Sequence, residues 1–266
     1  MKKQKDKKYK DKTYKDKKYR DKKRKTEKWT DIILNIFWPR TCPFCGKVNY
    51  EGICEPCRKK VDKLQIQEPR CLKCGKPVRY QEQEFCHDCS KMEHCYDRGL
   101  SMWLHKPPVN HAIYQLKYHN QRYYARYFAQ EICRTYEKEV RLWRPQALVP
   151  VPLHRRRRRR RGFNQAELLA NEIGEIWGIP VIPDLVKRVH YTGYQKKLDP
   201  WGRKKNLEHA FAPGADPAAL PADFRRIMII DDIYTTGNTV DQVAKILKSM
   251  GIQKVYFLTI SIGQGY

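Results

Sequence analysis

The chain has 266 residues and a net charge of +26, because 55 Lys and Arg face only 29 Asp and Glu. A field this positive favours polyanionic partners such as nucleic acid, anionic lipid or polyphosphate metabolites. The longest apolar run, 32–38, is too short to span a bilayer, and the basic N-terminus lacks the apolar core of a secretion signal, so the cytoplasm is the expected compartment.

Residues 1–28 are predicted to be a disordered basic tail. They hold 16 Lys or Arg against 5 acidic residues, and 6–25 are four tandem pentapeptides that each begin with Asp. With almost no aliphatic residue to bury, the repeats are not expected to fold. Lys clusters interleaved with Tyr9, Tyr14 and Tyr19 suit single-stranded nucleic acid through charge and stacking. A dispensable basic arm is the alternative.

Residues 29–95 are predicted to form a short helix followed by a cysteine module. The helix spans 29–38, with Thr30 as its N-cap. A basic tail before an apolar helix suits peripheral contact with an anionic membrane, here the inner face of the cell membrane. Packing of the helix on its own domain is the alternative.

The module holds nine of the ten cysteines, and eight of them form four Cys-x2-Cys pairs. Two pairs make one tetrahedral set, for which zinc is the usual ion, so we predict two structural zinc ions. Disulfides would need an oxidising compartment, and iron–sulfur ligation is a further alternative. Sequential pairing is the simplest arrangement, and interleaved pairing stays open. The predicted ligands are Cys42, Cys45, Cys54, Cys57, Cys71, Cys74, Cys86 and Cys89.

Residues 96–266 are predicted to form an α/β domain. Candidate strands alternate with candidate helices, which favours a mostly parallel sheet with helices on both faces. A Pro- and Ala-rich stretch, 213–223, is a predicted surface loop. The predicted strands are 98–104, 147–150, 180–182, 186–189, 227–231 and 254–261, and the predicted helices are 109–140, 165–177 and 239–250.

Seven consecutive arginines, 155–161, follow the strand 147–150 and His154. We interpret this stretch as a loop between a strand and a helix. Its guanidinium groups suit a phosphate, because Arg donates bidentate hydrogen bonds to phosphate oxygens. Most of these arginines are expected to face solvent. A solvated charge run or a nucleic-acid patch is the alternative.

A buried strand is predicted to stop at Asp231 and Asp232, before a short loop and a helix. Ligands of parallel sheets bind outside the carboxyl ends of the strands, so the two carboxylates are expected beside a ligand. The loop places backbone N–H groups and hydroxyls at a helix N-terminus, which favours a phosphate. An Asp that merely caps the helix is the alternative. The loop residues are Thr235, Thr236, Gly237, Asn238 and Thr239.

This segment resembles the phosphoribosyl pyrophosphate (PRPP) motif of type I phosphoribosyltransferases. The resemblance implies that Asp231 and Asp232 accept hydrogen bonds from the ribose 2′- and 3′-hydroxyls. It also implies that residues 235–239 cradle the 5′-phosphate and that Mg²⁺ accompanies PRPP. In those enzymes the loop after an early strand holds the pyrophosphate, which implicates His154, Arg155 and Arg161.

With the double cysteine module, the phrase from Arg161 to Gln165 resembles the ComF family of competence proteins. The resemblance covers about residues 30–263, although the family often has Gly where this chain has Asn120. In PRPP-using relatives the region before Pro213 forms a hood, where Arg203 and Asn206 would hold pyrophosphate or order the hood. Other matching residues are Leu116, Lys117, Tyr118, Thr192, Gln195 and Phe211.

The resemblance implies a cytoplasmic protein of DNA uptake in natural transformation. Such a protein would handle incoming single-stranded DNA beside a membrane channel and an ATP-driven translocase. Its fold implies PRPP binding and leaves phosphoribosyl transfer as an open question. No side chain is an obvious general base, and His154, Tyr194 or a group of the ligand itself could serve. The alternatives are a non-catalytic single-stranded DNA-binding protein and a scaffold whose ribbon docks a partner.

Overall fold

A computed structural model of the chain describes residues 39–190, 210–214, 221 and 223–263. The chain divides into two compact units, 1–54 and 55–266. The tail, the helix predicted at 29–38 and the hood residues 192–206 lie outside the described residues. The predicted domain boundary after residue 95 stays a prediction.

The described part of the first unit, 39–54, is a tight turn built around Cys42 and Cys45. An antiparallel bridge joins Thr41 to Val48. The Cys42 N–H donates to the Lys47 carbonyl at 2.8 Å, which closes the turn around the two thiols.

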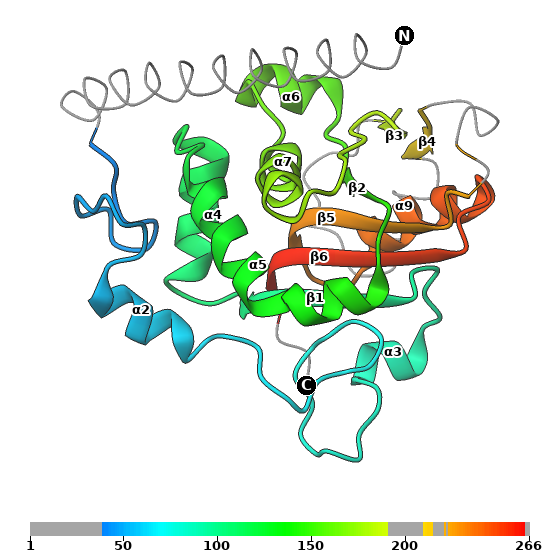
Figure 1. Cartoon of the computed structure of the whole chain (residues 1–266), viewed down its shortest axis with the longest axis horizontal. Coiled ribbons are helices and arrows are strands. Elements are labelled where there is room, and N and C mark those ends of the chain that lie inside the picture. The colour runs from blue at the N-terminus through cyan, green and yellow to red at the C-terminus, as the bar shows by residue number, and fades with distance from the viewer. Residues whose placement is uncertain (1–38, 191–209, 215–220, 222, 264–266) are drawn as a thin grey trace, which may run out of the picture. The chain divides into compact units, whose positions relative to one another are not determined.

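The second unit contains a parallel sheet with the strand order β1-β6-β5-β2 (Figure 1). Its central strands are almost wholly buried, as expected for continuous apolar runs covered on both faces. All four strands end at the same edge of the sheet because they run in parallel. The strands are β1 (Arg98–Leu104), β2 (Ala147–Pro150), β5 (Arg226–Tyr234) and β6 (Lys254–Ile262).

Helices cover both faces of this sheet. Ile227 and Ile229 of β5 share a core with α9 (Asn238–Ser249). Successive side chains of a strand point to opposite faces, so the intervening residues of β5 face the other way. There the sheet contacts α7 (Gln165–Trp177) and α5 (Tyr124–Trp143). The prediction of a mostly parallel sheet with helices on both faces is therefore confirmed.

The remaining elements are short. The cysteine-rich segment 42–95, here called the ribbon region, contains α2 (Glu55–Asp62) and α3 (His87–Lys91). Neither helix was expected from the sequence. A separate antiparallel pair joins β3 (Val186–Arg188) to β4 (Phe211–Pro213). None of the described helices combines the length and the apolar character that crossing a bilayer requires.

Three predictions at 109–140 and 180–189 were wrong in detail. The single helix predicted at 109–140 is broken into α4 (Val109–Tyr118) and α5, with Asn120 at a φ of 54°. Asn tolerates this left-handed conformation, which ends a helix. Within the described part of the chain, 180–182 contribute one bridge, from Val181 to Leu148. Residues 186–188 pair with β4 instead of joining the main sheet.

The run 155–161 is a helix, α6 (Arg155–Arg161), and not the loop predicted from the sequence. Arg is a good helix former, which explains the difference. The His154 side chain caps the helix by accepting the Arg156 N–H at 3.2 Å, and Gly162 ends it at a φ of 81°.

Strand β5 continues three residues beyond its predicted end at Asp231. Pairing with β6 persists as far as Tyr234, which lies opposite Ile262. Asp231 and Asp232 therefore lie within the strand, where the ladder holds their backbone in place.

Candidate phosphate site and zinc centres

The centre of the candidate phosphate site is the acidic pair near the carboxyl end of β5. Asp231 and Asp232 are 8% and 5% exposed, so both carboxyl groups are largely withdrawn from water. The Asp232 N–H donates to Asp231 Oδ1 at 2.8 Å. Burial, reinforced by the negative charge of Asp232, raises the pKa of Asp231 to about 8. Asp231 is therefore poised to gain or lose a proton near neutral pH.

Lys117, at the end of α4, neutralises the second carboxylate. Its Nζ lies 2.7 Å from Asp232 Oδ2, and both side chains are largely buried. Sequence reasoning noted Lys117 in the Leu-Lys-Tyr phrase without giving it a role. Lys117 and Asp232 are more than a hundred residues apart in the chain, so no local sequence pattern could predict their contact.

A loop and a helix N-terminus follow the acidic pair. Residues 235–237 connect β5 to α9, a helix of 12 residues whose first N–H groups have no intrahelical partner. Gly237 has a φ of 82°, and a Cβ at this position would lie 2.5 Å from Tyr234 Oη. Thr235 is exposed, and Thr236, Asn238 and Thr239 are half-buried. The loop thus offers N–H groups and hydroxyls beside the carboxylates.

His105 and Ser261 lie at the same edge of the sheet and were also missed from the sequence. His105 follows β1, and its Nδ1 is 2.9 Å from Ser261 Oγ at the end of β6. Burial, reinforced by the positive charge of Lys117, lowers the pKa of His105. Its position directly after a parallel strand was the signal that could have identified it.

A basic pocket of about 510 Å³ lies where β2, α6 and β3 meet. His154, Arg155 and Arg158 line it together with Arg188 of β3. Burial, reinforced by the charge of Arg157, lowers the pKa of Arg188 to about 10, while Asp231 acts in the opposite direction. Arg188 is therefore the electrostatic link between this pocket and the acidic pair.

The predicted site residues do not all come together. Asp231 and Asp232 adjoin the loop 235–239, while His154 and Arg155 line the basic pocket, whose lining does not include the acidic pair. Arg161 lies apart from that lining, with its guanidinium 4.9 Å from the centre of the Tyr118 ring. Arg203 lies outside the described residues.

The cysteines form two clusters of four, and the pairing is sequential. In each cluster the Sγ atoms all lie within 4.8 Å of one another. Four thiolates about 2.3 Å from a tetrahedral zinc ion lie about 3.8 Å apart. The Cys45–Cys54 and Cys74–Cys86 Sγ distances are 3.7 Å and 3.6 Å, so both clusters fit structural zinc. The first cluster is Cys42, Cys45, Cys54 and Cys57, and the second is Cys71, Cys74, Cys86 and Cys89.

The second cluster is part of the core that supports residues 235–239, which we call the phosphate loop. Cys71, Cys74 and Cys86 share one buried apolar cluster with Tyr234 and with Val240 of α9. This packing is tight, because a Cβ at Gly75 would lie 2.7 Å from the Gly99 carbonyl oxygen. The ribbon at this cluster is therefore built into the α/β unit.

Comparison with known proteins gives one match to the cysteine-rich segment and several matches that cover most of the chain. Residues 33–90 match the model of the double zinc ribbon domain. Competence protein F of Haemophilus influenzae is 31% identical over 207 residues, which cover 77% of this chain and 87% of that protein. DNA utilization protein YhgH of Salmonella typhimurium is 30% identical over 224 residues, or 82% of this chain and 94% of that protein. Competence protein ComFC of Bacillus subtilis is 26% identical over 208 residues, or 76% and 80%.

A solved structure is also similar. The crystal structure of purine phosphoribosyltransferase from Pyrococcus horikoshii has 17% sequence identity and a TM-score of 0.31, covering 51% of this chain and 73% of that one.

Proposed function

The chain belongs to the competence protein F family, and on this premise we propose that it acts in DNA uptake during natural transformation and binds PRPP. The names of the relatives, which are competence and DNA utilization proteins, support the role in uptake. The translocase ATPase of the uptake machinery is the protein partner that this role implies.

One observation carries the PRPP proposal: two buried carboxyl groups lie near the end of a strand that leads through a short loop to the N-terminus of a 12-residue helix. Asp231 and Asp232 would accept hydrogen bonds from the two ribose hydroxyls. The N–H groups and hydroxyls of 235–239 would donate to the 5′-phosphate, which the helix dipole also favours. Neighbouring parts of one strand–loop–helix unit would therefore bind the ribose and the 5′-phosphate of the same molecule.

The pyrophosphate needs positive charge and hydrogen-bond donors, and the candidates from the sequence are His154, Arg155, Arg161 and Arg203. The structure adds Lys117, which lies beside Asp232. Bound Mg²⁺ would supply further neutralisation of the pyrophosphate oxygens. The residues of the chain orient the ribose and offset charge on the pyrophosphate. The proposal covers binding of PRPP and assigns no general base for transfer to an acceptor.

Calorimetric titration of the zinc-loaded protein with Mg²⁺–PRPP tests this site. We expect saturable binding that Asp231→Asn with Asp232→Asn abolishes, because the amides cannot replace two anionic acceptors. Zinc content should be unchanged in this double variant. Asp62→Asn, which alters an exposed carboxylate at the end of α2, is the control and should bind like the wild type. Unchanged PRPP affinity in the double variant would contradict the assignment of the PRPP site to Asp231 and Asp232.

A second candidate function, binding of single-stranded DNA, is supported by a basic and aromatic surface. Tyr114 and Tyr118 of α4 are 51% and 47% exposed, and Arg161 lies over the Tyr118 ring. Five of the seven arginines of α6 are exposed, as expected from the sequence. Exposed rings stack on bases while arginines neutralise phosphates, which requires no particular base sequence.

The expected result is binding of a single-stranded oligonucleotide that weakens steeply with salt. Tyr114→Ala should weaken it by about 1–3 kcal/mol, the value of one stacked base. Tyr80→Ala removes another exposed tyrosine, in the ribbon region, and should have no effect. Fluorescence anisotropy at several salt concentrations provides the measurement, and equal losses in the two variants would contradict this surface.

A further inference from the structure

The two zinc centres have the same four-thiolate composition but differ in how far their sulfur atoms are exposed. In the first centre Cys45 is exposed and Cys54 is half-buried, and the contact between their Sγ atoms lies at the surface. In the second centre the comparable pair, Cys74 and Cys86, is 0% and 2% exposed. A reagent dissolved in water therefore reaches the first pair directly, whereas reaching the second pair requires the core to open.

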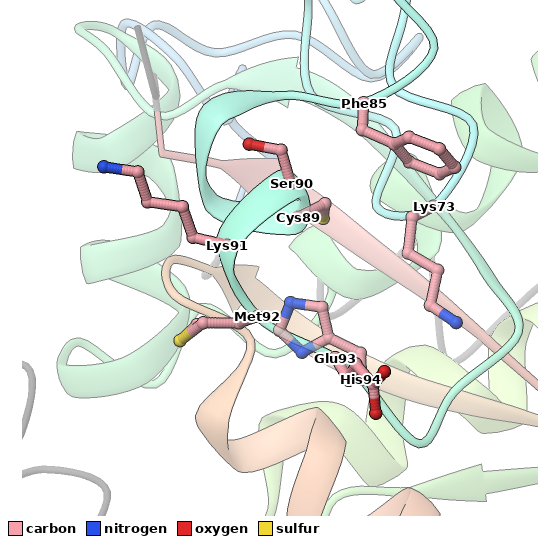
Figure 2. A pocket seen from close by; sticks show the side chains of 8 residues that line it. All are labelled: Lys73, Phe85, Cys89, Ser90, Lys91, Met92, Glu93 and His94. Atoms are coloured by element: carbon pink, nitrogen blue, oxygen red, sulfur yellow. The ribbon is translucent and has the colours of Figure 1, made fainter.

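Cys89 is the most exposed ligand of the second centre. It is half-buried on α3 beside Ser90, where it lines a pocket of about 430 Å³ (Figure 2). Its three partners, Cys71, Cys74 and Cys86, lie in the apolar core that the ribbon shares with the sheet. Because side chains in a close-packed core cannot shift freely, an oxidised Cys89 would have no partner sulfur that can move toward it.

Cys45 and Cys54, by contrast, lie in a part of the chain that has room to adjust. Their Sγ atoms are 3.7 Å apart, and both residues belong to the compact unit 1–54. Gly46, which follows Cys45, has a φ of 73°, and no atom of the described residues lies within 4 Å of a Cβ placed there. The turn at Cys45 therefore has open space beside it, so the two sulfur atoms can approach without displacing packed side chains.

The chemistry of zinc-bound cysteine makes this exposure important. A cysteine binds zinc as a thiolate, and the thiolate is also the form that attacks oxidants. Among several thiolates the accessible ones are oxidised first, to a sulfenic acid that condenses with a neighbouring thiol. An exposed thiolate with a second thiolate 3.7 Å away meets both requirements, and of the two centres only the first has such a pair.

We propose that Cys45 and Cys54 form a modification site at which a hydroperoxide converts two thiolates of the first zinc centre into a disulfide. The Cys45 thiolate attacks hydrogen peroxide, the O–O bond breaks, and a sulfenic acid and hydroxide form. The Cys54 thiolate then attacks the sulfenic sulfur, the S–S bond forms, and a second hydroxide leaves. The two thiolates together lose two electrons, which the peroxide gains.

This oxidation separates the fates of the two centres. The disulfide leaves Cys42 and Cys57 as the remaining thiolates of the first centre, and a structural zinc site needs four ligands. The first centre therefore loses its metal, while the second centre keeps its four thiolates and continues to support the phosphate loop. The modification site shares no residue with the proposed PRPP site.

Treatment of the zinc-loaded full chain with hydrogen peroxide tests the proposal, with the released zinc measured by a chelating dye. We expect two phases, in which one zinc ion is released at least about tenfold faster than the other, because only the second centre requires the core to open. Reduction of the fast-phase product with dithiothreitol, followed by addition of zinc, should restore the full metal content. Release of both ions at equal rates would overturn the proposal.

Peptide mapping identifies the sulfur atoms that are joined in the fast phase. Trypsin cuts after Lys47, which separates the two Cys-x2-Cys pairs of the first centre. Mass spectrometry of the alkylated fast-phase product should show peptides 41–47 and 48–58 joined, with fragmentation placing the bond between Cys45 and Cys54. The four thiols of the second centre should all be alkylated. A fast-phase product in which Cys45 is alkylated would contradict the proposal.

Two variants test the role of the Cys45 thiol. Cys45→His removes this thiol but supplies another zinc ligand, since three cysteines and one histidine also form structural zinc sites. The variant should bind two zinc ions and lack the fast phase. Cys95→Ser is the control, because Cys95 is a half-buried cysteine outside both clusters, and the fast phase should be unchanged. A fast phase that persists in Cys45→His or disappears in Cys95→Ser would overturn the proposal. If Cys45→His fails to hold zinc, the peptide map of the unaltered chain decides.

Discussion

At the scale of single residues, the acidic pair shows how burial changes what a carboxyl group can do. Asp232 forms an ion pair with Lys117 at 2.7 Å, while burial raises the pKa of Asp231. Two adjacent carboxyl groups in one strand therefore have different surroundings, an ammonium group for Asp232 and a largely uncompensated burial for Asp231. The ionised form is the stronger acceptor toward ribose hydroxyls, so ligand binding and proton release are linked.

This linkage predicts the pH dependence of PRPP affinity. Burial raises the pKa of Asp231 in the free protein to about 8, so the group is largely protonated below that pH, and hydrogen bonds from the ribose favour release of the proton. Affinity should therefore rise with pH between about 7 and 8, by at most about tenfold per pH unit, and level off above that range. Calorimetry in two buffers of different ionisation enthalpy counts the protons released, after correction for the titration of PRPP itself. A flat profile with no proton release would contradict this account of Asp231.

The limits of sequence reasoning are clearest at the residue scale. The acidic pair and the loop 235–239 stand together in the sequence, so their neighbourhood was predictable. Lys117, His105 and Arg188 come from α4, the end of β1 and β3, and only the folded chain brings them near the pair. Sequence patterns predict local structure well, but they do not show which distant segments come into contact.

At the scale of elements, strong patterns predicted structure well and mixed patterns did not. The predicted strands 98–104 and 147–150 and the helix 165–177 have the same bounds in the structure. The strands are continuous apolar runs and the helix has a regular apolar periodicity, and each of these patterns favours one type of secondary structure. The run of arginines was predicted to be a loop between a strand and a helix. Arg favours helices, however, and His154 and Gly162 cap the two ends of α6. The short strand β4 exists through its pairing with β3, which no local pattern revealed.

The turn between β5 and α9 offers a test of how closely the phosphate loop is fitted. Gly237→Ala should destabilise the protein, because a Cβ would lie 2.5 Å from Tyr234 Oη and φ is 82°. Gly178→Ala is the matched control, since its φ is 69° but no atom of the described residues lies within 4 Å of the added atom. We expect about 1 kcal/mol for the control, from backbone strain alone, and about 2–4 kcal/mol for Gly237→Ala. Denaturant unfolding gives both values, and equal costs would show that the loop is not tightly packed.

At the scale of the whole molecule, the two zinc centres differ in how they are embedded. Cys71, Cys74 and Cys86 share a core with Tyr234 and α9. The Tyr96 and Tyr234 hydroxyls also lie 2.7 Å apart in that core. By contrast, Cys42, Cys45 and Cys54 belong to the compact unit 1–54. The second centre is therefore tied to the phosphate loop within the unit 55–266, and three of the four ligands of the first centre belong to the other unit.

This difference predicts unequal effects of removing one ligand from each centre. Cys42 and Cys74 are both 0% exposed, so Cys42→Ser and Cys74→Ser are matched changes. Each variant should lose one zinc ion, because three thiolates hold the metal less well than four. Cys74→Ser should also lower the melting temperature of the unit 55–266 and weaken PRPP binding, while Cys42→Ser should leave both nearly unchanged. Metal analysis, calorimetric melting and PRPP titration provide the three measurements, and identical melting of the two variants would refute the distinction.

The shared core of the second ribbon and the phosphate loop also sets an order of events during biosynthesis. A newly made chain cannot complete that core until the thiolates at 71, 74, 86 and 89 have captured their metal. The supply of zinc in the cell would thus determine how many molecules mature. A cell starved of zinc would accumulate chains whose phosphate loop is unformed, even though every residue of that loop is present.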